Sequence, residues 1–201
     1  MILGAVLLAA ALSLFLYNQH EATQAKQASD KLMPLLAEQI KENVAKETQS
    51  STPSTLPQVL PEAIQNTEST EMDVSTVDGY DYIGFLTIPK FELELPVMSD
   101  WSYPQLRIAP CRYVGSVRSG DLVIMAHNYA RHFGLLEDLT VGDDITFTDM
   151  RGNATVYQVV GLDILPPTAV KEMTSGEYDL TLFTCTFGGR SRVTVYCDKM
   201  K

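Results

Sequence analysis

The sequence has no surplus of basic residues. It carries 15 lysines and arginines against 25 acidic residues, which gives a net charge of −10. Proteins that bind nucleic acids normally have a basic surplus that neutralises phosphates. We therefore expect no nucleic-acid partner.

Cysteine and histidine are also scarce, with three of each in 201 residues. Three cysteines cannot build a disulfide-rich scaffold, and no Cys-x-x-Cys pair or Cys/His cluster has the spacing of a zinc site. The sequence therefore predicts no metal centre. A disulfide between Cys111 and Cys197 is an open alternative, because disulfides persist outside the cell.

Charge is missing altogether from residues 1–17, MILGAVLLAAALSLFLY. As a helix, this segment would span about 25 Å at about 1.5 Å per residue, against a bilayer core of about 30 Å. No basic residues precede the apolar run and no Ala-x-Ala cleavage site follows it, which argues against a cleaved signal peptide. We predict a transmembrane anchor over residues 1–17.

Two further segments separate this anchor from the rest of the chain. Residues 18–50 are rich in Ala, Gln, Glu and Lys, with Leu32, Leu36, Ile40 and Val44 at helical spacing. They predict a solvated helical stem, kinked or delayed by the proline at position 34, with a self-association seam as the alternative. Residues 51–78 are dominated by Ser, Thr and Pro and predict an extended linker.

Residues 79–201 carry short apolar or alternating runs between turn signals, as all-β domains do. About seven strands in some 120 residues favour a small barrel or sandwich. A short helix is predicted over 132–139, and Trp101 and Tyr103 are expected to pack rather than contact a ligand. The strands are predicted near 82–88, 94–97, 121–126, 144–149, 154–165, 180–185 and 192–197.

Three residue types in this unit could carry chemistry. Cys185 ends a predicted strand, and His127 follows another apolar run. Arg190 and Arg192 lie across a Gly-Gly turn from Cys185, and a hairpin would bring the start of the last strand beside the thiol. A nucleophilic cysteine needs a nearby base or cation, because a free thiol has a pKa of about 8.5. The plain alternative is a buried structural cysteine.

Together these residues resemble the sortase family. The run Thr181-Leu-Phe-Thr-Cys185 matches the sortase TLxTC motif, His127 follows an apolar strand, and Arg192 opens the last strand. The opening YIGFLTIP, residues 82–89, and the following LPV, residues 95–97, also look like the start of a sortase domain. The resemblance covers residues 80–198.

The resemblance implies a mainly all-β fold, a closed barrel of about eight strands with short helices, and a membrane-anchored cysteine transpeptidase. Cys185 would attack an LPxTG-like sorting signal, His127 would act as general acid and base, and Arg192 would stabilise the oxyanion. Thr184 and Asn128 would contact the substrate. No cofactor is implied. The implied partners are sorting-signal peptides of surface proteins and an amine of a peptidoglycan precursor or a pilin.

The resemblance also implies a single-pass protein of a Gram-positive cytoplasmic membrane, with its catalytic domain outside the cell. The run 127–133 looks class B-like, but the segment from Thr168 to Asp179 is too short for the helix that class B sortases insert there, so the class is open. Glu172 and Glu177 leave a calcium site as an alternative. A tethered binding module with an inert thiol, or a peptidase that lets water resolve the thioester, are the alternative functions.

Overall fold

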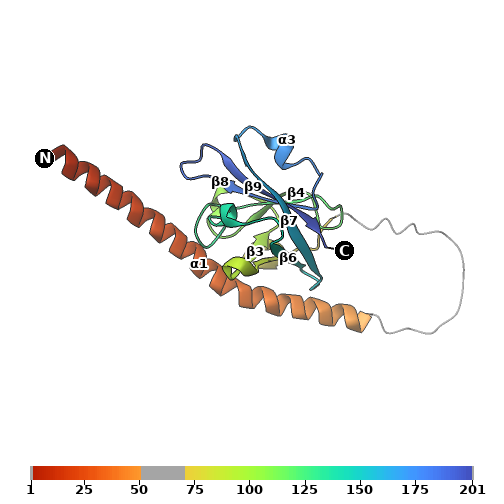
Figure 1. Ribbon diagram of the computed structural model, residues 1–201. Coiled ribbons are helices and arrows are strands. Elements are labelled where there is room, and N and C mark those ends of the chain that lie inside the picture. Colours follow the sequence, from red (N-terminus) through yellow and green to blue (C-terminus); the bar gives the residue numbers. More distant parts are fainter. Residues whose placement is uncertain (1, 51–70, 201) are drawn as a thin grey trace, which may run out of the picture.

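A long N-terminal helix lies along one side of a small β-barrel (Figure 1). The computed structural model describes residues 2–50 and 71–200. The helices are α1 (Ile2–Ser50), α2 (Tyr103–Leu106) and α3 (Val170–Met173), with short 3-10 helices η1 (Pro89–Phe91) and η2 (Leu136–Asp138). The strands are β1 (Ser75–Val77), β2 (Tyr80–Ile88), β3 (Leu93–Met98), β4 (Cys111–Val114), β5 (Leu122–Met125), β6 (Asp144–Asp149), β7 (Ala154–Leu165), β8 (Leu180–Cys185) and β9 (Arg192–Lys199).

Eight of these strands close into a barrel. Hydrogen bonds connect them in the order β2-β3-β4-β5-β8-β9-β7-β6, and β6 pairs back with β2. Neighbours are antiparallel except β3 with β4 and β5 with β8, which run parallel. Closure satisfies the backbone groups that an open sheet edge would expose. The predicted closed barrel of about eight strands is confirmed, and β1 adds a further strand beside β2.

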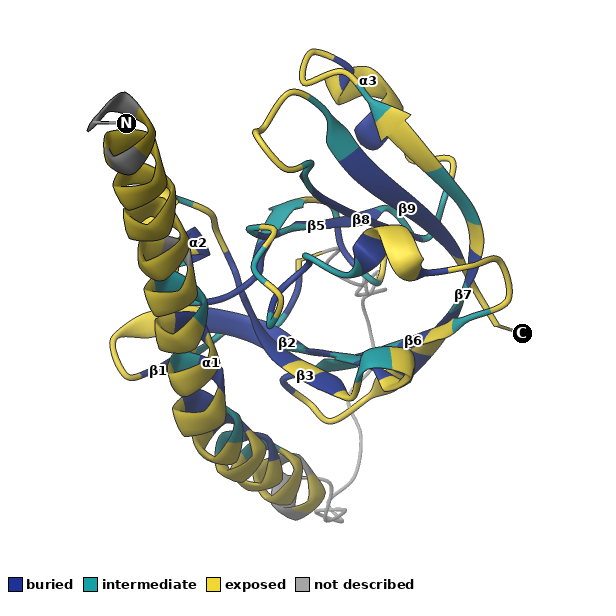
Figure 2. Ribbon diagram, turned by 60° about the vertical axis from the view of Figure 1, so that its left-hand side comes forward, coloured by how far each residue is buried: buried dark blue, intermediate teal, exposed yellow. Residues whose placement is uncertain are grey.

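The barrel interior is filled by side chains from alternate positions of its strands. Along β7, Thr155, Tyr157 and Val159 are buried whereas Val156 is exposed, as the period of two of a strand requires. Figure 2 shows the buried positions concentrated on the strands and the exposed ones on the connecting turns. The largest fully buried barrel side chains are Tyr82, Tyr157, Phe133, Phe147, Ile83, Leu86, Ile88, Leu95, Met98, Leu122 and Ile124.

All seven predicted strands are present, and two more were missed. The strands predicted over 144–149, 154–165 and 180–185 have those bounds in the structure. The missed strands β1 and β4 have three and four residues, too few to show an alternation in the sequence. The helix predicted over 132–139 is wrong: only the 3-10 turn η2 forms there. The amides of residues 132–134 bond instead to carbonyls of residues 127 and 129, which folds the chain back on itself.

Gly84 explains one part of the opening motif of the folded unit. It lies in β2 with φ +146°, at the register shift between β2 and β3. A β carbon at this position would lie 2.0 Å from the backbone oxygen of Thr148 on β6. Glycine is required here because β2 contacts two partner strands at this point and leaves no room for a side chain.

The second half of α1 packs on the barrel instead of standing in solvent. Leu32, Leu36 and Ile40 are buried and belong to one apolar cluster with Tyr82 and Met98 of the barrel. Figure 2 shows this buried stripe on the side of α1 that faces the strands. The predicted helix forms, but the prediction that it is solvated is wrong. Leu32, Leu36 and Ile40 of the stripe that suggested self-association are covered by the barrel of the same chain, whereas Val44 is 42% exposed.

Pro34 lies inside α1, and the helix continues through it. Proline has no amide hydrogen and its ring crowds the preceding turn, so a helix bends where it occurs. Figure 1 shows α1 changing direction near its middle. The bend lets α1 follow the wall of the barrel.

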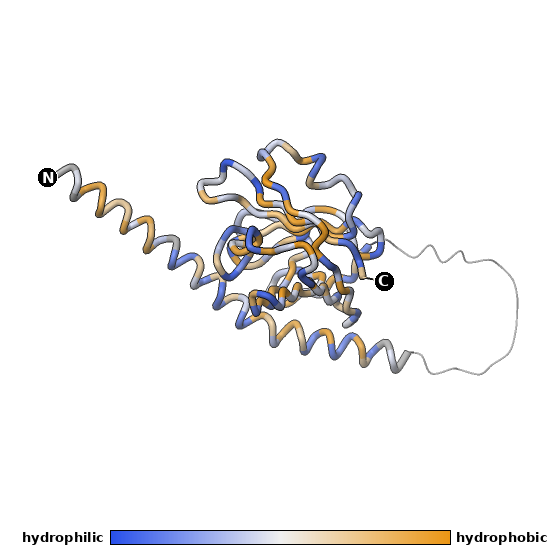
Figure 3. Tube along the Cα trace, in the orientation of Figure 1, coloured by the Kyte–Doolittle hydropathy of each residue, from blue (hydrophilic) through white to orange (hydrophobic). Residues whose placement is uncertain are grey.

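The first half of α1 begins with mostly apolar turns that extend beyond the barrel (Figure 3). Within residues 2–50 and 71–200, the structure contains no helix that combines the length and the apolarity needed to cross a membrane. This finding does not support the transmembrane anchor predicted over residues 1–17. The exposed apolar side chains in this half include Val6, Leu7, Leu8, Leu12, Leu14, Phe15 and Leu16.

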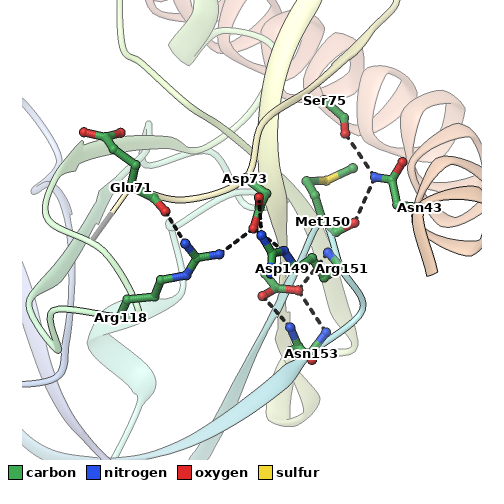
Figure 4. Close-up of polar contacts among 9 residues, drawn as sticks. All are labelled: Asn43, Glu71, Asp73, Ser75, Arg118, Asp149, Met150, Arg151 and Asn153. Atoms are coloured by element: carbon green, nitrogen blue, oxygen red, sulfur yellow. Dashed lines mark hydrogen bonds and ion pairs between the residues drawn. The ribbon is translucent and has the colours of Figure 1, made fainter. Parts of the chain in front are cut away.

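A polar network fastens the chain where it returns to the barrel (Figure 4). Nη2 of Arg151 donates a hydrogen bond of 2.9 Å to the carboxylate of Asp73, and Nε of Arg151 lies 2.6 Å from it in an ion pair. Arg118 donates a further hydrogen bond of 2.5 Å to the same carboxylate. Asn43 of α1 donates to the carbonyl oxygen of Met150 at 2.9 Å and to the hydroxyl of Ser75. The linker predicted over 51–78 lies outside the described residues up to position 70. Its described end is held on the barrel and includes β1.

Candidate active site

The predicted catalytic residues form one row across three neighbouring strands. In the parallel pair β5–β8, Met125 lies opposite Phe183, so the same register brings His127 beside Cys185 just beyond the strand ends. In the antiparallel pair β8–β9, Cys185 lies directly opposite Arg192. Side chains at paired positions project from the same face of a sheet. The thiol therefore lies between the imidazole and the guanidinium.

His127 is fixed by backbone hydrogen bonds on both sides. The preceding residue, Ala126, donates its amide to the carbonyl of Phe183 at 3.3 Å, and the carbonyl of His127 accepts from the amide of Phe133 at 3.1 Å. The imidazole is half-buried, and burial lowers its pKa because the charged form loses solvation. A histidine held in place in this way can serve as a proton donor and acceptor.

Cys185 differs from the other two cysteines in its exposure. Cys111 and Cys197 are completely buried, and burial raises the pKa of both thiols to about 12. Cys185 is partly exposed at the end of β8. All three cysteines are free, so the alternative disulfide between Cys111 and Cys197 is not present. Only Cys185 combines access with a neighbouring imidazole.

The structure separates the two candidate arginines. Arg192 opens β9 and lines the same cavity as Cys185, whereas Arg190 is exposed in the preceding turn and does not line it. The guanidinium of Arg192 donates to the backbone carbonyls of Gly189 and Ser191, at 3.2 and 3.1 Å. These bonds hold the side chain at the turn, close to the thiol.

A cavity of about 210 Å³ opens on this row. Its walls are mostly apolar or aromatic, and α3 and the preceding Pro167 lie along one side. Sequence reasoning missed most of this wall and assigned Trp101 and Tyr103 to packing alone. Both rings line the cavity, and they meet edge to face with centroids 6.0 Å apart. The lining residues beyond the catalytic row are Trp101, Tyr103, Leu106, Tyr113, Met125, Ala126, Pro167, Val170, Met173, Phe183 and Thr184.

The two residues predicted to contact substrate differ in burial, although both border a second cavity beside Cys185. Thr184 is buried, and its hydroxyl donates to the carbonyl oxygen of Ala126 at 2.8 Å. This bond ties β8 to the segment that carries His127. Asn128 is exposed and lines this second cavity of about 200 Å³, which Cys185 also borders. The structure thus brings Asn128 near the thiol, on another side from the aromatic cavity.

The two acidic residues considered for calcium lie apart from this row. Glu172 and Glu177 border a separate cavity, together with Asp163 and the stacked rings of Tyr178 and Tyr196. Among the residues that the structure describes, no group of three or more His, Cys, Asp or Glu side chains could hold a metal ion.

The comparisons with known proteins agree with the fold of the barrel. The family model described as "Sortase domain" matches residues 86–200. Sortase C1 from Streptococcus suis is 26% identical, with a TM-score of 0.52 over 60% of this chain and 73% of that one. Sortase C1 from Streptococcus agalactiae is 25% identical, with a TM-score of 0.56 over 63% of this chain and 71% of that one.

Sortase A from Corynebacterium diphtheriae is 20% identical and shows the fold alone, with a TM-score of 0.55 over 94% of this chain and 96% of that one. The comparison with curated protein sequences finds no match.

Proposed function

The chain belongs to the sortase family, and from this premise we propose that it is a cysteine transpeptidase acting on an LPxTG-like sorting signal. The enzyme cleaves the signal through a thioester and joins the released protein to an amine of a cell-wall precursor or a pilin. The observation that carries the proposal is the row of His127, Cys185 and Arg192 at the mouth of one cavity.

The reaction needs each member of this row. The sulfur of Cys185 attacks the backbone carbonyl carbon of the threonine of the signal, and the carbonyl oxygen becomes an oxyanion beside Arg192. When the C–N bond breaks, His127 gives its proton to the leaving amine. The acceptor amine then attacks the thioester, His127 takes its proton, and the thiolate leaves as the new amide forms. No cofactor takes part in these steps.

The character of the cavity supports a peptide substrate with an apolar start. Met125, Met173 and Phe183 give it an apolar wall, and Trp101 and Tyr103 lie at its exposed side. Such a surface suits the leucine and proline of a sorting signal, because burial of their side chains supplies binding energy without unpaired polar groups. The cavity also keeps water from the thioester, which favours transfer over hydrolysis.

The proposal is tested on the full chain with a panel of sorting-signal peptides and an added amine, followed by mass spectrometry. We expect a Cys185-linked acyl adduct and an amine-exchanged product, both absent from Cys185→Ala. Hydrolysed product alone, with every amine tried, would show a peptidase instead. Binding of peptide that Cys185→Ala retains, with no adduct in the native chain, would show a non-catalytic binding module.

The arginine assignment has a matched control within the same turn. Arg192→Ala should lower kcat by about 10²–10³-fold, the usual loss when one oxyanion donor is removed. Arg190→Ala should leave kcat within about twofold, because that side chain is exposed outside the cavity. Equal losses in the two variants would contradict the assignment.

We also propose that the barrel works on the outer side of the cytoplasmic membrane of a Gram-positive bacterium, where sorting-signal proteins and their acceptors meet. Protease added to intact protoplasts should then degrade the barrel. Protection of the barrel until the cells are lysed would contradict an external location. Attachment to that membrane through residues 1–17 stays a separate prediction.

A further inference from the structure

The helix α1 contacts the loop that carries His127. Glu21 lies four residues before Ala25, which is completely buried, so its side chain is on the face of α1 that turns toward the barrel. One carboxylate oxygen of Glu21 accepts a hydrogen bond of 2.5 Å from the phenol of Tyr129. The other accepts one of 2.7 Å from the phenol of Tyr17, one turn earlier on α1.

Tyr129 transmits this contact to the catalytic histidine. Its ring lies against the imidazole of His127, with centroids 4.9 Å apart and planes tilted by 33°. The same ring also lies beside the imidazole of His132, with the two ring centroids 5.5 Å apart. The short bond to Glu21 fixes the phenol end of this ring, since hydrogen bonds to a carboxylate are stronger than those between neutral groups.

The ionisable groups near His127 come from α1, the end of α2, the loop of His127 itself, and the strands β8 and β9 with Cys185 and Arg192. The carboxylate of Glu21 on α1 favours the protonated imidazole, while Arg107 at the end of α2 opposes it, and both act on the pKa of His127 beside the larger effect of burial. His132, on the same loop, is fully buried, and burial lowers the pKa of its ring to about 4, so it is neutral at pH 7. Among the described groups that shift the pKa of His127, Glu21 is the one carboxylate, and it favours the imidazolium.

We propose that Glu21 of α1, acting through Tyr129, is a positioning residue for His127, so that the active site extends onto the N-terminal helix. The inference rests on the proposed transpeptidase function. The carboxylate holds the Tyr129 ring against the imidazole and stabilises the imidazolium. In the proposed reaction the imidazolium of His127 holds the proton that the leaving amine receives. The helix α1 therefore helps to keep His127 protonated when Cys185 attacks the substrate.

The test compares Glu21→Gln, Tyr129→Phe and Glu38→Gln with the native full chain. Gln at position 21 keeps a hydrogen-bond acceptor but removes the charge, whereas Phe at 129 keeps the ring and removes the bond. Glu38 is exposed on the same helix and serves as the control. The first readout is NMR titration of the His127 ring, assigned with His127→Gln. The second is the pH profile of kcat/KM for the sorting-signal peptide.

We expect the His127 titration midpoint to fall in Glu21→Gln and in Tyr129→Phe, and to stay unchanged in Glu38→Gln. The alkaline limb of the pH profile should move in the same direction, with about three- to tenfold lower kcat/KM at neutral pH, a fraction of a full acid–base contribution. Thermal unfolding checks that each variant folds. If one of Glu21→Gln and Tyr129→Phe fails to fold, the other still tests the proposal.

A His127 midpoint that does not move in either variant would overturn the inference, whatever the peptide kinetics. A midpoint that moves as expected in a chain that turns over no peptide would leave the positioning of His127 supported and overturn the transpeptidase function. The NMR readout therefore separates the two failures.

Discussion

Replacement of Leu36 by alanine tests the docking of α1 on the barrel. Leu36 is completely buried between the helix and the barrel, whereas Leu35, the next residue, is 40% exposed. Removing a fully buried leucine side chain costs about 2–5 kcal/mol, of which a part is the cavity left behind. The helix side of this contact is one layer of side chains and can relax. We therefore expect Leu36→Ala to weaken the docking of α1 on the barrel by about 3 kcal/mol.

Leu35→Ala provides the matched control on the same helix. It removes the same atoms from solvent-exposed positions and replaces leucine with a better helix former, so the effect should stay within about 0.5 kcal/mol. Hydrogen exchange of the α1 amides over residues 28–44 is the assay, because it reports local opening of the helix. If these amides exchange when α1 undocks, a loss of about 3 kcal/mol in the docking free energy corresponds to roughly a hundredfold faster exchange.

Two results would refute the reasoning. Equal exchange rates in Leu36→Ala and Leu35→Ala would show that the buried stripe does not hold α1 in place. Exchange at the rate of an isolated peptide in the native chain would show that the helix is not docked at all.

Three further predictions concern the barrel. Iodoacetamide should alkylate Cys185 at neutral pH while Cys111 and Cys197 remain unmodified until the protein unfolds, which peptide mapping checks; equal labelling of all three would contradict the burial argument. Gly84→Ala should lower the free energy of unfolding by about 3 kcal/mol in urea titration, because its β carbon meets backbone of the facing strand; an unchanged midpoint would argue against the close approach. Burial raises the pKa of Asp73, but its two arginine partners outweigh burial and hold that pKa below its ordinary value. The ion pairs therefore stabilise the fold above the unfolded pKa of the carboxyl group, and this stabilisation is lost as the pH falls through the folded pKa. Asp73→Asn should therefore lower the Tm at pH 7, and this loss should shrink as the pH falls through the folded pKa of Asp73; a loss that is the same at neutral and at acid pH would exclude the ion pairs as the cause.

The sequence predicted the barrel strands where the pattern is local. The alternation of buried and exposed residues along β6 and β7 can be read without a partner, and these strands have the predicted bounds. The helix expected over 132–139 failed because its apolar spacing is also satisfied by a loop whose amides bond to the carbonyls of His127 and Tyr129. The spacing of apolar residues does not determine which carbonyl group accepts the hydrogen bond of a given backbone amide.

The candidate site divides in the same way. Motifs identified Cys185, His127 and Arg192, because each follows or opens a recognisable strand. The aromatic wall that includes Trp101 could not be predicted, since it depends on how a loop folds over a cavity formed by distant strands. Glu21 gave no signal either, because a glutamate on a polar helical stretch looks solvated until the face toward the barrel is known.

The parallel pairing of β5 with β8 has a consequence for the order in which the chain folds. Thr184 and Ala126, which this pairing joins, are 58 residues apart, and β6 and β7 lie between them in the sequence. Contacts between such distant segments form late, because the entropy of closing a long loop must be lost before they become favourable. The imidazole is therefore expected to reach the thiol late in barrel closure. In a partly folded chain Cys185 and His127 are far apart, and the row proposed for catalysis is assembled only with the native barrel.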